Sequence, residues 1–166
     1  MASADYHLKI EGIEGEAMTE GFEKQLQLKS WSWGSTNSGS AATGSGMGSG
    51  KCSPQDFHFV IENGKGSVQL GLANWKGNHL AEAVLTCRRT TGDGTPQPYY
   101  EVKFDKCVIS SFQEGGSDGS DILPMVQISF NYSKVTATYF EQNQEGRNTR
   151  AKSVSYDVKL GKAEGN

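Results

Sequence analysis

The segment with the strongest resemblance to a chemical motif is Ser45-Gly46-Met47-Gly48-Ser49-Gly50-Lys51-Cys52. A phosphate-binding P-loop needs G-x-x-x-x-G-K-[ST], because its backbone N–H groups cradle phosphate and its last hydroxyl holds Mg²⁺. Here Ser45 stands where the first glycine is required, and Cys52 stands where the hydroxyl is required. The residues that follow have the pattern of a strand, whereas a P-loop leads into a helix. The sequence therefore argues against nucleotide binding.

Two further sets of residues could do chemistry. The turn from Gly115 to Asp121 could offer carboxylates to Ca²⁺, but it is too short for an EF-hand loop and does not repeat. The histidines, His7, His58 and His79, are far apart in the sequence, and neither H-E-x-x-H nor G-x-S-x-G occurs. We interpret the turn as a solvated hairpin tip. We therefore expect no catalytic residues, no metal site and no cofactor.

The cysteines give no sign of redox or zinc chemistry. Cys52, Cys87 and Cys107 are widely spaced and form no C-x-x-C pair. We expect buried, reduced thiols in a cytosolic fold.

Length and composition restrict the class of protein. The chain has 166 residues, a net charge of -3 and only 35% hydrophobic residues, and we treat residues 1–166 as one soluble domain. No basic stripe is present, so nucleic acid is not an expected partner. No apolar run approaches the length of a membrane span. The N-terminus lacks the basic and apolar regions of a signal peptide, so export would need another route.

Alternation of apolar and polar residues dominates the chain and predicts strands. It occurs in at least seven places in the printed sequence, around residues 6–10, 26–33, 57–61, 100–112, 126–132, 135–139 and 154–160. In the stretch 100–112 we expect Tyr100, Val102, Phe104, Val108 and Phe112 to share one face. Many strands with Gly-rich turns indicate a small β-barrel or sandwich.

One segment, about residues 67–76, has helical spacing. Val68, Leu72 and Trp75 lie at i, i+4 and i+7, so we expect this apolar face to pack on the sheets. Ser67 is the expected N-cap, and Gly77 is the expected C-terminal stop.

The segment from Gly34 to Gly50 contains no charged residue and, apart from Met47, no sizeable apolar side chain. It cannot bury enough surface to order itself, so we predict a flexible loop at about 35–50.

The triplet Trp31-Ser32-Trp33 follows Leu26 and Leu28, and the apolar parity changes between the two pairs. Such a change requires a β-bulge or a strand that is covered on both faces. We expect the indoles to pack in the core and not to form a ligand platform, because burial of two indoles is strongly favourable. Ser30 and Ser32 then share the opposite face.

Several segments, in order, resemble the haemolysin-coregulated protein (Hcp) family of type VI secretion. They are Tyr6–Glu16, Leu28–Gly34 with the Gly/Ser-rich loop, Gln55–Phe59, the short helix with Gly77-Asn78-His79, and Val108–Phe112 with its Gly-rich turn. The resemblance runs from about residue 5 to residue 160. One departure is Asn63-Gly64-Lys65-Gly66-Ser67, which stands where the family's helix often begins with a Ser-Ser-Pro-like run.

The resemblance implies a mainly β fold, a small barrel of two sheets with one short flanking α-helix, that forms a hexameric ring. Rings would stack into a tube inside a contractile sheath, and the tube would be expelled with its tip and carry effectors. Homo-hexamers, stacked rings, effector proteins, and sheath and spike components are the implied partners. The protein would stay in the bacterial cytoplasm until assembly and would then be secreted without a signal peptide.

Within this scheme Ser30 and Ser32 are the expected lumen and effector contacts. The ring-stacking loop would include Ser38, Gly44, Met47 and Gly50.

Three alternatives stay open. The chain could be a tube protein of a phage tail or a related contractile injection system. It could be an enzyme or toxin, although the sequence ends at Asn166, soon after the last expected strand, which leaves no room for an effector domain. It could also be a monomeric ligand-binding barrel.

Overall fold

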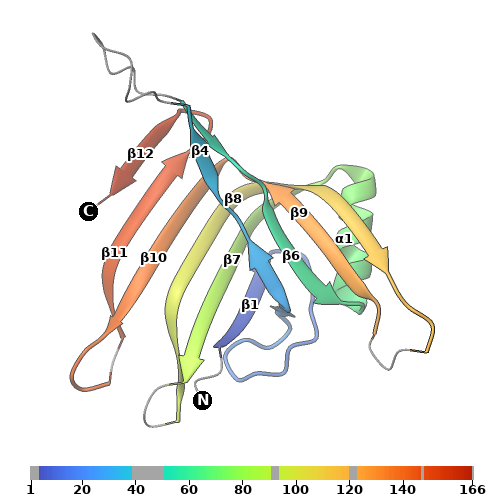
Figure 1. Cartoon of the computed structure of the whole chain (residues 1–166), viewed down its shortest axis with the longest axis horizontal. Helices are drawn as coiled ribbons and strands as arrows, with labels where there is room; N and C mark the ends of the chain where they lie inside the picture. Colours follow the sequence, from blue (N-terminus) through green and yellow to red (C-terminus); the bar gives the residue numbers. More distant parts are fainter. Residues whose placement is uncertain (1–3, 39–50, 91–93, 120–122, 147, 166) are drawn as a thin grey trace.

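The computed structural model describes residues 4–38, 51–90, 94–119, 123–146 and 148–165. This described part of the chain is rich in strands and has one helix, as predicted (Figure 1). The elements are β1 Ala4–Ile10, β2 Leu26–Gln27, β3 Ser30–Ser32, β4 Ser35–Asn37, β5 Cys52–Pro54, β6 Phe57–Glu62, α1 Lys65–Lys76, β7 His79–Thr90, β8 Pro96–Gly115, β9 Met125–Asn131, β10 Lys134–Gln142, β11 Asn148–Asp157 and β12 Lys162–Gly165. No helix among the described residues is long and apolar enough to cross a membrane.

Strand β8 belongs to both layers of the fold because it is 20 residues long. Its first part lies between β7 and β10 in a layer with the order β12-β11-β10-β8-β7-β1-β2. Its last part pairs with β9, which pairs with β6, which in turn pairs with β3. The two layers face each other across the core (Figure 1). A separate two-stranded ribbon is formed by β4 and β5.

The expected two-sheet barrel is not closed by hydrogen bonds among the described strands. β2 pairs with β1, and β3 pairs with β6. The chain passes from one layer to the other between them: the Leu28 N–H donates to the Tyr6 carbonyl at 2.9 Å, and the Lys29 N–H donates to the Val60 carbonyl at 2.8 Å. This crossing explains the parity change between Leu28 and Trp31, which we expected to be a bulge or a doubly covered strand.

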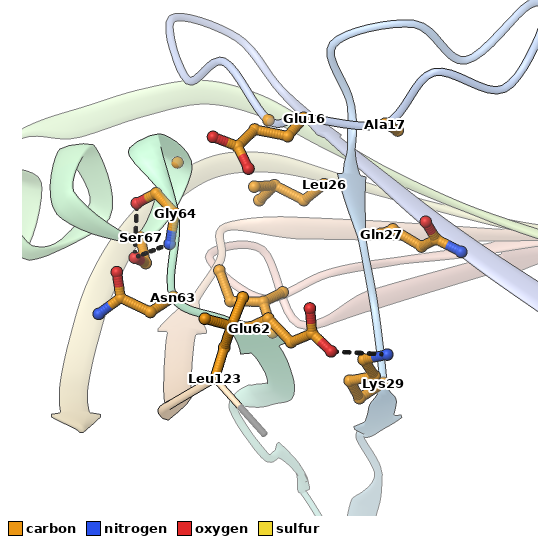
Figure 2. A pocket seen from close by; sticks show the side chains of 13 residues that line it. Glu16, Ala17, Leu26, Gln27, Lys29, Glu62, Asn63, Gly64, Ser67 and Leu123 are labelled. Carbon is orange, nitrogen blue, oxygen red and sulfur yellow. Dashed lines mark hydrogen bonds and ion pairs between the residues drawn. The ribbon is translucent and has the colours of Figure 1, made fainter. Parts of the chain in front are cut away.

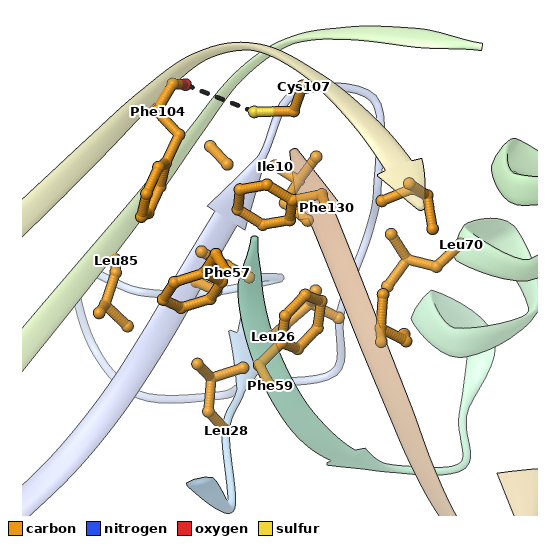
Figure 3. Close-up of a cluster of buried hydrophobic side chains, with 14 of the residues drawn as sticks. Ile10, Leu26, Leu28, Phe57, Phe59, Leu70, Leu85, Phe104, Cys107 and Phe130 are labelled. Carbon is orange, nitrogen blue, oxygen red and sulfur yellow. Dashed lines mark hydrogen bonds between the residues drawn. The ribbon is translucent and has the colours of Figure 1, made fainter. Parts of the chain in front are cut away.

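The core between the layers is built on phenylalanines (Figure 3). Phe57 lies with its ring centroid 4.9 Å from that of Phe104 and 5.1 Å from that of Phe130. All three side chains are fully buried. Such tilted and stacked pairs add to the stabilisation from burial alone, so this cluster holds the two layers together.

The predicted alternation of buried and exposed residues along β8 is wrong beyond Phe104. Lys106 has a left-handed φ of 51° and is exposed, and this local twist shifts the buried positions to Cys107 and Ile109. Further along, the register of β8 against β9 shifts between Ile109 and Ser111. Because a bulge adds one residue to one strand, a strict period of two cannot follow β8 through it.

The helix differs from prediction at its start. α1 begins at Lys65, and Gly64 is its N-cap, whereas Ser67 occupies the third helical position. The Ser67 hydroxyl accepts from the Gly64 N–H at 3.0 Å and donates to the Gly64 carbonyl at 2.8 Å. Gly77 ends the helix with a φ of 66°, as predicted.

The predicted buried face of the helix is also wrong. Val68, Leu72 and Trp75 are 64%, 46% and 75% exposed. The buried face is made of small residues and one leucine, namely Gly66, Ser67, Leu70, Gly71 and Ala73. Glycine allows this close approach: a Cβ at Gly66 would lie 2.5 Å from Leu26 Cδ2, and a Cβ at Gly71 would lie 3.1 Å from the Phe112 ring.

The predicted flexible loop starts with ordered strand. Residues 35–37 form β4 and pair with β5, and Ser38 follows as an exposed residue. Gly44, Met47 and Gly50, like residues 45–49 of the P-loop-like segment, lie outside the described residues. The residues after that segment form strand β5, as the sequence indicated.

Candidate functional site

Strand β3 has two contrasting faces. On one face the Trp31 indole packs with the rings of Tyr6, Phe57 and Tyr100, at centroid distances of 5.8, 6.2 and 6.5 Å. Trp33 meets Phe104 edge to face at 6.0 Å. Both indoles are half-buried and pack against the core, on the side that the sequence predicts. Ser30 and Ser32 point the other way and are exposed.

The opposite face of β3 continues across three neighbouring strands as two polar rows. Strand pairing aligns one row as Ser32, His58, Ser129 and Ser111, and the other as Ser30, Val60, Gln127 and Gln113. We call these eight residues the polar face. The adjacent row, Trp31, Phe59, Ile128 and Phe112, lies on the core side of the same strands. The layer thus separates an apolar core from a hydrogen-bonding outer surface.

Hydroxyl groups hold one corner of the polar face in place. Ser129 is 3% exposed, and its Oγ lies 2.8 Å from Ser110 Oγ and 2.6 Å from Ser111 Oγ. The Ser110 hydroxyl donates to Asp56 Oδ2 at 2.5 Å. The register shift between Ile109 and Ser111 makes both serines available to Ser129. The buried hydroxyl is therefore satisfied and needs no ligand.

The polar face is hollowed. A depression of about 520 Å³ is lined by Ser30, Ser32, His58, Gln113 and Gln127, together with neighbouring residues of the same strands. Its central side chains carry hydroxyl, amide and imidazole groups. Hydroxyls and amides both donate and accept, so this surface can form hydrogen bonds with many partners.

A second hollow, of about 270 Å³, lies beside the start of α1 (Figure 2). Glu16 approaches the helix N-terminus there, with its Oε2 3.1 Å from the position of a Cβ on Gly64. A carboxylate at this end complements the helix dipole, which is a structural role. Lys29 and Glu62 form an ion pair of 3.0 Å on the rim. Lys29 and Glu62 thus satisfy each other, and the described residues that line the hollow form no nucleophile–base arrangement.

The remaining candidate residues are dispersed or inert. His7 is buried, whereas His58 and His79 are exposed on separate strands. Within the described ranges, no group of three or more His, Cys, Asp or Glu side chains could hold a metal ion. Cys87 and Cys107 are free and buried, and burial raises the pKa of both thiols to about 12. Cys52 is free and half-buried.

The sequence argument placed Ser30 and Ser32 on one face but did not find His58, Gln113 and Gln127 beside them. Each is the polar member of an alternating pattern, which is the signal that could have singled them out. Their grouping depends on strand register, and register is a long-range property.

Comparison with known proteins gives the context of this face. A family model described as "Type VI secretion system effector, Hcp" matches residues 7–139. Protein hcp1 of Pseudomonas aeruginosa is 35% identical over 144 residues, which cover 87% of this chain and 88% of that protein. The chain belongs to the Hcp family. The family is a type VI secretion family, and the sequence-based assignment is thereby confirmed.

Solved structures support the same fold. The crystal structure of Hcp1 from Salmonella typhimurium superposes with a TM-score of 0.78 at 25% identity, covering 99% of this chain and all (100%) of that one. A structure of a type six secretion system protein gives a TM-score of 0.88 at 23% identity, covering 98% of this chain and 100% of that one. The arrangement of layers, ribbon and flanking helix is therefore the Hcp fold.

Proposed function

We propose that this Hcp protein is the tube subunit of a type VI secretion apparatus, and that its polar face lines the channel of a hexameric ring. Rings stack into a tube that is expelled and carries or chaperones effectors. The protein resides in the cytoplasm before assembly and is then exported as part of the expelled tube. Sheath and spike components are the other partners of the assembled tube.

One observation carries the channel assignment: the indoles of Trp31 and Trp33 pack against the core, whereas Ser30 and Ser32 lie on a hollowed polar surface. A channel that carries varied proteins needs a wall that does not adhere by apolar contact. Small hydroxyls meet that need because they hydrogen-bond without filling the channel.

Ring formation is tested by mass measurement and electron microscopy of the purified protein. A subunit mass of 18.0 kDa in solution, with no rings in the images, contradicts the proposal. Free strand edges, such as the outer edge of β12, are available for contacts between copies.

The channel role is tested by Ser32→Gln, which enlarges the side chain without adding charge. We expect intact rings and reduced stabilisation and export of a co-expressed effector. Thr149→Gln is the control, because Thr149 is an exposed hydroxyl residue on β11, in the other layer. Unchanged effector handling by Ser32→Gln removes this residue from the channel contacts. Failure of the ring means that Ser32 faces another subunit instead.

The stacking role of the loop is a separate proposal. Ser38 is exposed and directly follows β4 of the β4–β5 ribbon, and Gly44, Met47 and Gly50 come next in the sequence. Deletion of residues 40–49 should preserve the ring and impair tube assembly or secretion. Normal secretion by the shortened protein would mean that the loop is a tolerated insertion.

A further inference from the structure

The central side chains of the polar face carry no formal charge apart from any proton on His58. The hollow of about 520 Å³ is lined by serines, glutamines, His58 and apolar residues of β3, β6, β8 and β9. Val60 is the one aliphatic member of the two rows, and it is half-buried. The surface therefore offers hydrogen bonds beside some apolar area, and among its described residues it has no carboxylate or ammonium group at its centre.

The charged groups that border the polar face are already engaged. At one end Glu62 pairs with Lys29 at 3.0 Å, as the dashed line in Figure 2 shows. At the other end Asp56 accepts the hydroxyl hydrogen of Ser110 at 2.5 Å. A charged partner would have to displace these contacts to find an opposite charge. A neutral partner would not.

Gln113 and Gln127 are the side chains best placed to bind. They are directly opposite each other in the β8–β9 register, and both are exposed. Neither forms a side-chain hydrogen bond with another residue in the described part of the chain. Each amide offers two donor hydrogens and one acceptor oxygen, which matches the amide and hydroxyl groups of a protein surface.

We propose that the polar face binds uncharged protein surface rich in amide and hydroxyl groups, and that Gln113 and Gln127 set this preference. The location of the face inside a ring rests on the proposed function, whereas its binding chemistry does not. Complementarity is the argument: a neutral partner keeps every polar group paired, whereas an ionic partner loses solvation at a surface that cannot compensate it. Binding should then depend little on salt.

The test uses three fluorescent peptides of equal length and the assembled wild-type protein. One peptide is built of Ser, Asn, Gln and Gly, a second carries lysines, and a third carries glutamates. Fluorescence anisotropy is measured in buffers from about 50 to about 500 mM NaCl. We expect the neutral peptide to bind most tightly and its dissociation constant to change less than roughly twofold over this range, since no ion pair is screened.

The variants are Gln113→Glu and Gln127→Glu, singly and together, because they add charge with almost no change in shape. Each single substitution should weaken binding of the neutral peptide roughly three- to tenfold, as expected for one lost neutral hydrogen bond. The lysine peptide should gain affinity at low salt only. Gln144→Glu is the matched control, because Gln144 is an exposed turn residue outside the polar face. This variant should bind the neutral and the lysine peptide with wild-type affinity.

Several results would overturn the inference. One is that a charged peptide binds more tightly than the neutral one and with strong salt dependence. Another is that no peptide binds. A third is that the neutral peptide binds both glutamine variants as tightly as it binds the wild type. Ring formation and effector export are measured on the same proteins. Rings that export effector but bind peptides without regard to the glutamines refute this inference and leave the tube function standing. Glutamine-dependent binding by a protein that forms no ring refutes the tube function and leaves this inference standing.

Discussion

The imidazole of His7 stacks on the phenyl ring of Phe22, with the ring centroids 4.8 Å apart. His7 is on β1 and is fully buried, and neither of its ring nitrogens has a hydrogen-bond partner within the described structure. Arg88 also covers Phe22, with Cζ 4.6 Å from the ring centroid, and donates to both carboxylate oxygens of Asp5 at 3.0 and 2.6 Å. Phe22 therefore packs the connection between β1 and β2 against a buried imidazole that has no hydrogen-bond partner among the described residues.

Acid should loosen this contact. Burial lowers the pKa of His7 below 6.5, the charge of Arg88 lowers it further, and the nearby Asp5 carboxylate opposes the shift. The unfolded chain therefore binds a proton on this residue more readily than the folded chain does. Stability contributed by neutral His7 is full above about pH 6.5 and is lost as the pH falls below it.

We expect the urea midpoint of the wild type to fall between about pH 7.5 and about pH 5 by more than that of His7→Phe. At neutral pH His7→Phe should stabilise the fold by about 1 kcal/mol, because it removes a buried polar group without a partner. His58 and His79 are present in both proteins and cancel in the comparison. Parallel pH profiles for the two proteins would contradict a role for His7.

Two leucines of α1 should respond very differently to truncation. Leu70 is fully buried in the core, whereas Leu72 is 46% exposed. Leu70→Ala should cost about 2–5 kcal/mol of unfolding free energy because it leaves a cavity, and Leu72→Ala should cost about 0.5 kcal/mol or less. Urea unfolding measures both. A large loss for Leu72→Ala would show that its exposed face is covered in the assembled protein.

The cysteines should divide into one reactive and two inert thiols. Burial raises the pKa of Cys87 and Cys107 to about 12, so neither forms a thiolate at pH 8. Cys52 is half-buried and should react with a thiol reagent in the native protein. The reagent should label one thiol in the native protein and three in the denatured protein. Cys52→Ser should abolish labelling of the native protein. Rapid labelling of Cys87 or Cys107 would show that the core opens locally.

Gly15 should tolerate no side chain. A Cβ there would lie 2.2 Å from the Gln25 carbonyl oxygen, and the Gly15 N–H donates to the Lys24 carbonyl at 2.7 Å. Gly15→Ala should destabilise the fold by about 1–3 kcal/mol, because backbone must move to make room. Gly115→Ala is the control, because no atom lies within 4 Å of its added Cβ. Equal midpoints in thermal unfolding would mean that this connection adapts freely.

Local rules explain what could be predicted. The Cβ atoms of a strand alternate whatever the strand pairs with, so the packing of Trp31 and Trp33 against the core and the exposure of Ser30 and Ser32 follow from the sequence. The stop at Gly77 is equally local, because its left-handed φ of 66° favours a residue without a side chain. The segments between Tyr6 and Phe112 that resemble the family, in the same order along the chain, also identified it.

Tertiary structure decided the features that local rules do not reach. The spacing of Val68, Leu72 and Trp75 predicted the wrong helix face, because Gly66 and Gly71 let the opposite face approach the sheet more closely.

The grouping of Ser32 with His58, and of Gln127 with Gln113, depends on the register of strands that are distant in sequence. Register is fixed by the pairing of whole strands and is shifted by bulges such as the one between Ile109 and Ser111. The sequence by itself therefore determined which side chains are core and which are surface on β3. Only the packed sheet determined which surface side chains share the polar face, because hydrogen bonds between distant segments set that arrangement.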